Sequence, residues 1–344
     1  MLKTLIAALA AGLAASAVCA ADLSGAGATF PAPVYAKWAE TYRKQTGVGL
    51  NYQAIGSGGG VRQIKSKTVA FGASDKPLTP AELNQAGLVQ FPTVVGGVTP
   101  MVNLPGLAAN RLRLSGSVLA DIYLGAIKRW GDPRIAALNP GLKLPNLPIT
   151  VVHRADGSGT SFLFTSYLAM KNPTWAKQVG GADAVEWPTG IGGKGNDGVA
   201  AFVKQTPGAI GYVEYAFAKQ NKLPTVSLQN KAGQFVAPAA ANFSAAAASA
   251  DWSKAPGYYL LLLDQPGAAA WPITGATFVL MHRDQANAAS GQAVLKFFDW
   301  AYKTGDAQAV QLDYVPLPAG VKTLVRKTWA GSIKAGGKPV YAGG

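Results

Sequence analysis

The chain has 344 residues and a formal net charge of +14 at pH 7, with 31 lysine and arginine residues against 17 aspartate and glutamate residues. This balance favours anionic partners. The basic residues are scattered, without an arginine-rich tract or a motif that reads bases, so we expect no nucleic-acid partner. Cys19 is the only cysteine, which excludes disulfides and thiolate metal sites from the chain after residue 20.

Residues 1–20 read MLKTLIAALAAGLAASAVCA, in which one lysine precedes an apolar run that ends in small residues. This pattern predicts a secretory signal peptide with cleavage after Ala20. The run is shorter than a membrane-spanning helix requires. A lipid anchor on Cys19 stays open as an alternative, although the three residues before it are a poor context for lipidation.

Three segments share one pattern, in which a short apolar strand runs into a glycine-rich turn and then into a helix. They span residues 22–45, 48–67 and 147–170, and we expect the helix of the second from about Gly60. This alternation of strands and helices predicts an α/β fold. In open α/β sheets, ligands bind beyond the carboxyl ends of the strands, which is where all three turns fall. The sequence therefore predicts that the turns form one site.

Two extended segments with apolar residues and proline, 90–106 and 265–281, are typical of chain crossings between two parts of a molecule. They enclose a central block. We therefore expect a discontinuous domain I, formed by residues 21–95 and 275–344, and an inserted domain II, formed by residues 96–274. The glycine and proline residues of the crossings favour a hinge between the domains.

Three other segments have simpler interpretations. The run YYLLLL at 258–263 predicts a buried strand. The alanine-rich stretch 237–252 predicts a loop and then a short surface helix, capped near Asn242 or Ser244. The glycine-rich stretch 190–198 lacks the spacing and the Ser or Thr of a nucleotide-binding loop, so we do not expect it to contact a ligand.

The turn after the third strand, RADGSGTS, has the composition of an anion site. Helix N-termini present unpaired N–H groups and a partial positive charge. Glycines at 157 and 159 let the backbone approach a ligand, and Ser158 and Thr160 add hydroxyl donors. Arg154 adds a planar fork that matches two oxygens of a tetrahedral oxyanion. Asp156 either pairs with Arg154 or serves only as a turn residue.

The other turns add further donors and one carboxylate. Thr29 and the Phe30 amide lie in the first turn, and Ser57 lies in the second. Asp75 follows another predicted strand end, where a carboxylate would repel a fully ionised anion. It suits only a ligand that carries a proton, as hydrogen phosphate does at neutral pH and sulfate does not. Alternatively, Asp75 caps a helix that begins near Leu78.

The segments GAGATFPAPVY, YQAIGSGGGVRQI, FGASDKPL, RADGSGTSFLFTSYL and DYVPLP occur in this order. Together they resemble the periplasmic phosphate-binding proteins of bacterial phosphate ABC transporters, over essentially the whole mature chain. The resemblance implies a two-domain periplasmic binding fold, type II-like, with a hinge of two crossing segments and a ligand cleft that closes on dehydrated phosphate. Carried over by motif, it implies these phosphate-binding residues: Thr29, Phe30, Ser57, Asp75, Arg154, Ser158, Gly159 and Thr160.

The resemblance further implies a non-catalytic, high-affinity receptor in the periplasm, a monomer that delivers phosphate to the membrane permease of the transporter. No cofactor and no metal are expected. One alternative is a secreted phosphoesterase or serine hydrolase, but Ser158 is not in a G-x-S-x-G motif, and His153 and His282 are the only histidines. A basic protein that binds nucleic acid is a second alternative, which no motif supports. His153 either tunes the site or merely ends a strand.

Overall fold

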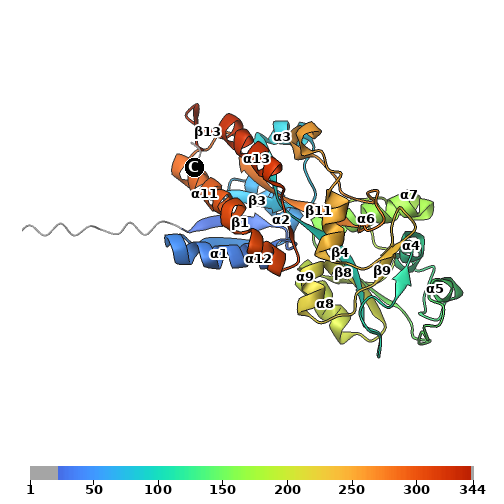
Figure 1. Cartoon of the computed structure of the whole chain (residues 1–344). Helices are drawn as coiled ribbons and strands as arrows, with labels where there is room; N and C mark the ends of the chain where they lie inside the picture. Colours follow the sequence, from blue (N-terminus) through green and yellow to red (C-terminus); the bar gives the residue numbers. More distant parts are fainter. Residues whose placement is uncertain (1–21, 342–344) are drawn as a thin grey trace, which may run out of the picture.

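Two lobes, joined by two long strands, make up residues 22–341, the part of the chain that the computed structural model describes (Figure 1). The joining strands are β4 (Leu88–Val102) and β11 (Thr274–His282). The first lobe contains these further elements: β1 (Leu23–Gly27), α1 (Ala32–Thr46), β2 (Leu50–Ala54), α2 (Ser57–Lys65), β3 (Phe71–Ser74), α3 (Pro80–Ala86), α11 (Ala288–Thr304), α12 (Asp306–Gln311), β12 (Val315–Pro316), α13 (Ala319–Ser332), β13 (Lys334–Ala335) and β14 (Lys338–Pro339).

The second lobe is built from the chain between β4 and β11. It contains these elements: β5 (Arg113–Leu114), α4 (Gly116–Tyr123), α5 (Pro133–Leu138), β6 (Thr150–Arg154), α6 (Gly159–Lys171), α7 (Pro173–Gln178), β7 (Ile191–Gly193), α8 (Gly195–Gln205), β8 (Ala209–Glu214), α9 (Tyr215–Gln220), β9 (Ser227–Gln229) and β10 (Phe235–Val236). The chain then returns to β11 through α10 (Ala240–Ala247), η1 (Trp252–Lys254) and η2 (Pro256–Tyr258).

One mixed sheet runs through both lobes in the order β2-β1-β3-β11-β4-β8-β6-β7, and β12 also pairs with β4. Strand β4 is buried along its whole length, and it pairs with β11 up to Gly97 and with β8 from Val98 onward. The predicted crossing at 90–106 therefore corresponds closely to β4, whereas the predicted crossing at 265–281 is a strand only from Thr274. The α/β fold with two domains is confirmed.

The first lobe begins with the predicted strand, turn and helix. Helix α1 starts directly after Pro31, which suits a helix start because its ring presets φ and it has no N–H to leave unpaired. Val34, Trp38 and Tyr42 are buried, as their helical spacing predicts. Gly47 ends the helix in the left-handed conformation, with a φ of 76°, where glycine carries no steric cost.

Two glycines bring helix α2 close to the ends of β1 and β3. A Cβ on Gly60 would lie 2.5 Å from the Cα of Gly27 and 2.8 Å from the carbonyl oxygen of Ala73. Gly27 itself has a φ of 147°, which other residues rarely adopt. This close packing places the start of α2 directly beside the strand ends. The helix begins at Ser57, three residues earlier than the expected start at Gly60.

The strand predicted at 258–263 is wrong. Tyr258 has a φ of 57°, outside the region of an extended strand, and the chain from Tyr259 to Leu262 has no regular secondary structure. A single isolated bridge joins Leu263 to Ile273. Tyr258, Leu262 and Leu263 of this run are buried all the same, whereas Tyr259 is exposed. The sequence pattern thus predicted burial correctly for part of the run, but burial alone does not distinguish a strand from an apolar connection.

The predicted helix in the alanine-rich stretch is confirmed as α10, although its predicted cap is wrong. The N-cap position is Ala239, and no side chain caps the helix. The Asn242 side chain instead donates a hydrogen bond to the carbonyl oxygen of Ala237, at 2.8 Å. The helix buries Phe243 against β4, where Gly97 leaves room for the ring. It is therefore part of the junction between the lobes and not only a surface helix.

The predicted signal peptide, with Cys19 and the cleavage site after Ala20, lies outside the described residues. Among residues 22–341, no helix combines the length and the apolar character needed to cross a membrane.

Candidate anion-binding site

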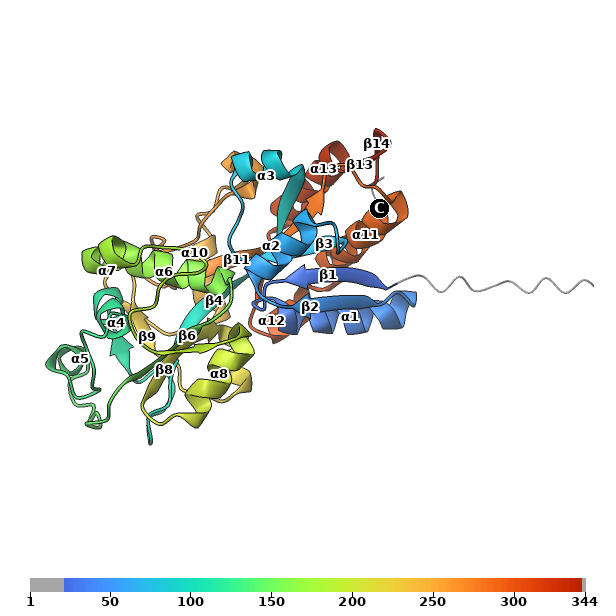
Figure 2. The same ribbon diagram turned by 180° about the vertical axis from the view of Figure 1, so that it is seen from behind.

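Helices α2 and α6 start beside each other at the junction of the lobes (Figure 2). The Ser57 hydroxyl oxygen accepts a hydrogen bond from the backbone N–H of Asp75, at 3.2 Å, within the first lobe. Gly159, the first residue of α6 in the second lobe, packs against both: a Cβ there would lie 2.5 Å from the Ser57 Oγ and 2.6 Å from the Asp75 Cβ. Three predicted site residues from two lobes therefore meet at one place.

Thr29 and Phe30 reach the same junction from the turn after β1. The Thr29 hydroxyl oxygen accepts hydrogen bonds from Asn196, at 2.7 Å from Nδ2 and at 3.2 Å from the backbone N. The carbonyl oxygen of Phe30 accepts a hydrogen bond from the Tyr314 hydroxyl, at 2.7 Å. Within residues 22–341, no acceptor pairs with the backbone N–H of Phe30. This amide is therefore free to donate to a ligand.

Arg154 ends strand β6 and is held by Asp156. Its Nε donates to Oδ1 of Asp156 at 2.8 Å and its Nη2 donates to Oδ2 at 2.5 Å. Of the two interpretations of Asp156, the structure shows the pairing with Arg154. Nη1 of Arg154 is buried and has no partner within the described part of the chain. The N–H groups of Nη1 are thus left over, on a buried nitrogen.

The Asp156 carboxylate is itself fixed in an ionised state. Its Oδ1 also accepts a hydrogen bond from the backbone N–H of Gly195, at 3.0 Å. Burial raises the pKa of Asp156, but the hydrogen bonds and charge of Arg154, together with the Gly195 bond, outweigh burial and leave that pKa below its ordinary value. Asp156 therefore neutralises and orients Arg154 over the whole physiological pH range.

Asp75 is the acidic member of the group and is almost completely buried. It does not cap a helix, because α3 begins at Pro80 and its cap is Thr79, which forms a capping box with Glu82. Burial raises the pKa of Asp75 to about 7, while hydrogen bonds from Thr277 and the Arg154 charge act in the opposite direction. The alternative interpretation of Asp75 as a helix cap is wrong.

The two oxygens of Asp75 face both lobes. Its Oδ1 accepts a hydrogen bond from the Thr277 hydroxyl of β11, at 2.7 Å. Its Oδ2 lies 3.5 Å from the Thr160 hydroxyl oxygen of α6, which is a weak contact at that distance. The carboxyl group is thus held in place but incompletely paired.

The start of α6 supplies the remaining donors. Ser158 is the N-cap, and its hydroxyl oxygen accepts a hydrogen bond from the backbone N–H of Ser161, at 3.0 Å. Its own proton is still available to a ligand. Among residues 22–341, no acceptor pairs with the backbone N–H groups of Gly159 and Thr160, which are the first two of the helix. The site therefore presents several donors and one carboxyl group, which suits a small oxyanion that carries a proton.

His153 lies outside this group of donors. Its ring stacks on Trp187, with 4.7 Å between the ring centroids, and its Nδ1 lies 3.1 Å from the carbonyl oxygen of Arg154. These contacts favour the interpretation of His153 as a strand-end residue. Within the described residues, no group of three or more His, Cys, Asp or Glu side chains could hold a metal ion.

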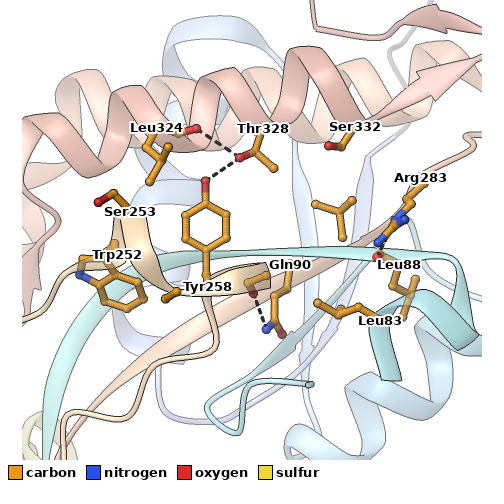
Figure 3. Close-up of a pocket in the computed structure, with 13 residues that line it drawn as sticks. Leu83, Leu88, Gln90, Trp252, Ser253, Tyr258, Arg283, Leu324, Thr328 and Ser332 are labelled. Carbon is orange, nitrogen blue, oxygen red and sulfur yellow. Dashed lines mark hydrogen bonds between the residues drawn. The ribbon is translucent and has the colours of Figure 1, made fainter. Parts of the chain in front are cut away.

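A separate pocket of about 300 Å³ lies in the first lobe, between α13, α3 and the segment of η1 and η2 (Figure 3). Two of its central polar side chains already have partners: the Tyr258 hydroxyl lies 2.6 Å from the Thr328 hydroxyl, and Gln90 Nε2 donates to the carbonyl oxygens of Leu78 and Gly257. None of the eight predicted site residues lines it. The pocket therefore does not belong to the anion site.

Similarity to known proteins identifies the family of this chain. The family model of the PBP superfamily domain matches residues 14–303. The phosphate-binding protein PstS of Pasteurella multocida is 53% identical over 316 residues, which are 92% of this chain and 92% of the relative. The chain belongs to the PstS family. The PstS protein of Haemophilus influenzae is 52% identical and covers 91% of this chain and 94% of its own.

A solved structure shows the same fold at lower identity. It is a putative phosphate ABC transporter substrate-binding protein from Clostridium perfringens with bound phosphate. It shares 18% identity with this PstS-family chain, covers 86% of this chain and 100% of its own, and has a TM-score of 0.63. The resemblance predicted from the sequence motifs is confirmed at the level of the family.

The sequence motifs of the PstS family did not indicate one buried residue of the site. Asn196, at the start of α8, contacts Thr29 and Thr160, although the stretch 190–198 was not expected to take part. A signal was available, because 191–198 is a fourth unit of strand, glycine turn and helix, formed by β7 and α8. The strand is only three residues long, so it escapes a search for apolar runs.

Proposed function

We propose that this chain binds inorganic phosphate between its two lobes in the periplasm and delivers it to the membrane permease of a phosphate ABC transporter. The observation that carries the proposal is the position of Asp75, a buried carboxyl group among donors suited to an anion. A site for an oxyanion without a proton would gain nothing from a carboxylate, because the two negative charges repel each other. A site for hydrogen phosphate gains an acceptor for the ligand's proton.

The predicted residues have complementary roles in this proposal. The donors are the free Nη1 of Arg154, the hydroxyl groups of the site and the unpaired backbone N–H groups at the two lobes. A hydrogen bond to a charged group contributes about 1.5 to 3 kcal/mol, so eight such contacts offset the desolvation of the anion. The binding free energy that is left after desolvation has to reach about 8 kcal/mol for micromolar affinity. No metal or covalent bond is required.

The selectivity for phosphate over sulfate follows from which of the two anions carries a proton. Ionised Asp75 accepts a hydrogen bond from the protonated oxygen of hydrogen phosphate, whereas sulfate has no proton and would place a negative oxygen directly against the carboxylate. The binding of sulfate therefore requires Asp75 to take up a proton from solution. The site rejects sulfate through this repulsive contact and not through its size.

We further propose that domain I (21–95 and 275–344) and domain II (96–274) capture the ligand by closing around β4 and β11. Strand β4 changes its partner from β11 to β8 after Gly97, which marks a natural hinge. Contacts between the lobes surround the site. The backbone N–H of Gly58 donates to the carbonyl oxygen of Gly157 at 2.9 Å, and Lys76 pairs with Asp183 at 2.7 Å.

An enzyme is the second candidate, because Ser158 lies in a site suited to a phosphoryl group. A serine nucleophile needs an adjacent base. Within the described residues, His153 packs on Trp187 and His282 bonds to the carbonyl oxygen of Ile64, so neither histidine contacts Ser158. We therefore favour capture without catalysis. A chromogenic phosphoester assay separates the two: turnover that Ser158→Ala abolishes would support hydrolysis.

Calorimetric titration of the mature chain with inorganic phosphate tests the proposed function. We expect one phosphate per monomer with micromolar or tighter affinity. Titration with DNA at several salt concentrations serves as the counter-test, because a basic nucleic-acid-binding protein would show a steep salt dependence. Absence of phosphate binding at millimolar concentration would overturn the proposal.

A further inference from the structure

Asn196 links the lobes at the anion site without being one of its predicted ligands. It is the second residue of α8 in the second lobe and is completely buried. Its Nδ2 donates to the Thr29 hydroxyl oxygen of the first lobe at 2.7 Å and lies 3.5 Å from that of Thr160. Its Oδ1 accepts a hydrogen bond from the backbone N–H of Glu214, at 3.0 Å.

The orientation of this amide is determined by its neighbours. The oxygen and nitrogen of an Asn side chain are distinguished by their hydrogen-bond partners. A backbone N–H can only donate, so the atom that faces Glu214 must be Oδ1. Nδ2 therefore faces the two threonine hydroxyls, and Asn196 acts on them as a donor.

The consequence for Thr29 follows from counting lone pairs. A hydroxyl group has two lone pairs and one proton. Thr29 accepts two hydrogen bonds from Asn196, one from Nδ2 and one from the backbone N, so both lone pairs are occupied. Within residues 22–341, the Thr29 hydroxyl donates to no acceptor. Its proton is left for a ligand.

We propose that Asn196 is a positioning residue that saturates the lone pairs of Thr29 and so makes its hydroxyl group an obligate donor to the bound oxyanion. The inference rests on the proposed function and extends it. Because Thr29 and Asn196 belong to different lobes, Asn196 occupies the lone pairs of the Thr29 hydroxyl only when the lobes close. Closure and ligand orientation are thus coupled through one hydrogen-bonded pair.

A double-mutant cycle tests this role by calorimetry with inorganic phosphate. Asn196→Ala and Thr29→Val should each weaken phosphate binding about tenfold, which corresponds to about 1.4 kcal/mol. The double variant should also be about tenfold weaker, and not about a hundredfold, because both changes remove the same donor. Independent effects that multiply would overturn the inference.

Asn196→Asp separates the donor role from packing. Aspartate has the same shape and still accepts a hydrogen bond from the Glu214 N–H. Its second oxygen, however, would accept the hydrogen bond that the Thr29 hydroxyl otherwise donates to the ligand. It also adds a negative charge beside the anion. We expect binding weaker than in Asn196→Ala. Binding equal to or tighter than that of the native chain would contradict the proposal. If Asn196→Ala does not fold, this isosteric variant still decides the question.

Two further measurements distinguish the possible failures. Asn103→Ala is the matched control, because Asn103 bonds to the carbonyl oxygens of Val203 and Lys204 at the other end of α8, and its loss should leave phosphate affinity unchanged.

The ratio of phosphate to sulfate affinity should be unchanged in Asn196→Ala, since both anions accept a hydrogen bond from the Thr29 hydroxyl. If the native chain binds no phosphate, the proposed function fails and this inference with it. If the native chain binds but Asn196→Ala matches it, only this inference fails.

Discussion

Asp156 holds Arg154 by two hydrogen bonds and leaves Nη1 of the guanidinium without a partner within the described residues. The carboxylate neutralises most of the charge of a buried arginine and fixes the plane of its fork. Nη1 is then preorganised as a donor, so little conformational freedom is lost when an anion binds.

Arg154→Ala should therefore weaken phosphate binding sharply, and Arg154→Lys should restore little of it. Lysine keeps the charge but not the fork that Asp156 orients. We expect a loss of about 1.5 to 3 kcal/mol or more for each variant, by calorimetry. Arg134→Ala, which removes a half-exposed arginine of α5, is the control and should bind normally. Native affinity in Arg154→Lys would show that the fork does not matter.

The pKa of Asp75 predicts how sulfate binding depends on pH. Burial raises this pKa from 3.8 to about 7. Between pH 4 and pH 7, Asp75 is therefore ionised when solvent reaches it and protonated when the closed site buries it. Sulfate brings no proton, and its affinity should rise as pH falls from 7 toward 4. The limit is about tenfold per pH unit, because one proton is taken up for each anion bound.

Phosphate brings its own proton, so its affinity should change much less than that of sulfate between pH 7 and pH 4. Calorimetry with sulfate at several pH values, in buffers of different ionisation enthalpy, measures the proton uptake directly. A sulfate affinity that is constant with pH would contradict the assignment of Asp75.

Gly159 predicts a variant that folds but fails to close. A Cβ at this position would meet Ser57 and Asp75 of the opposite lobe at 2.5 to 2.7 Å, closer than packed atoms allow. Gly159→Ala should lower phosphate affinity by at least about tenfold, a free-energy cost of the size usual for overpacking. Its thermal stability without ligand should be close to native. Small-angle scattering should show no compaction on addition of phosphate.

Gly320→Ala is the matched control for that variant, because a Cβ there would meet no atom within 4 Å. It lies in α13, away from the site, and should bind phosphate normally. Equal affinity in the two alanine variants would mean that the lobes do not need to approach as closely as the structure shows.

The ion pair between Lys76 and Asp183 crosses between the lobes beside the site, with about a third of each side chain exposed. Such pairs contribute at most about 1 kcal/mol and are screened by salt. Lys76→Ala should weaken phosphate binding less than about fivefold, mostly through faster release. Stopped-flow measurement of release at low and high salt checks this. A large effect that persists in high salt would assign Lys76 to the ligand site itself.

Much of the site could be predicted from the sequence because its residues follow local rules. Strand ends, glycine turns and helix starts are short-range features, and Thr29, Ser57 and Arg154 each lie in such a unit. What the sequence could not supply are partners that are distant along the chain. Thr277 contacts Asp75 across 202 positions, and Asn196 contacts Thr29 across 167.

The fold shows the same limit. The extended, apolar and proline-containing sequence of β4 predicts a crossing, but nothing local reveals that this strand changes partner after Gly97. The run 258–263 was apolar for a different reason, since it covers part of the first lobe without joining the sheet. Apolar composition reports burial, whereas pairing depends on which edges the tertiary fold leaves available.

The most direct test of the account is the ratio of phosphate to sulfate affinity in the native chain and in Asp75→Asn, measured by calorimetry at pH 8. The account predicts a ratio above about a hundredfold in the native chain, which is about 2.7 kcal/mol of discrimination. In Asp75→Asn the ratio should narrow, chiefly because sulfate binds better once no carboxylate faces it. The same ratio in both proteins would contradict the central role of Asp75.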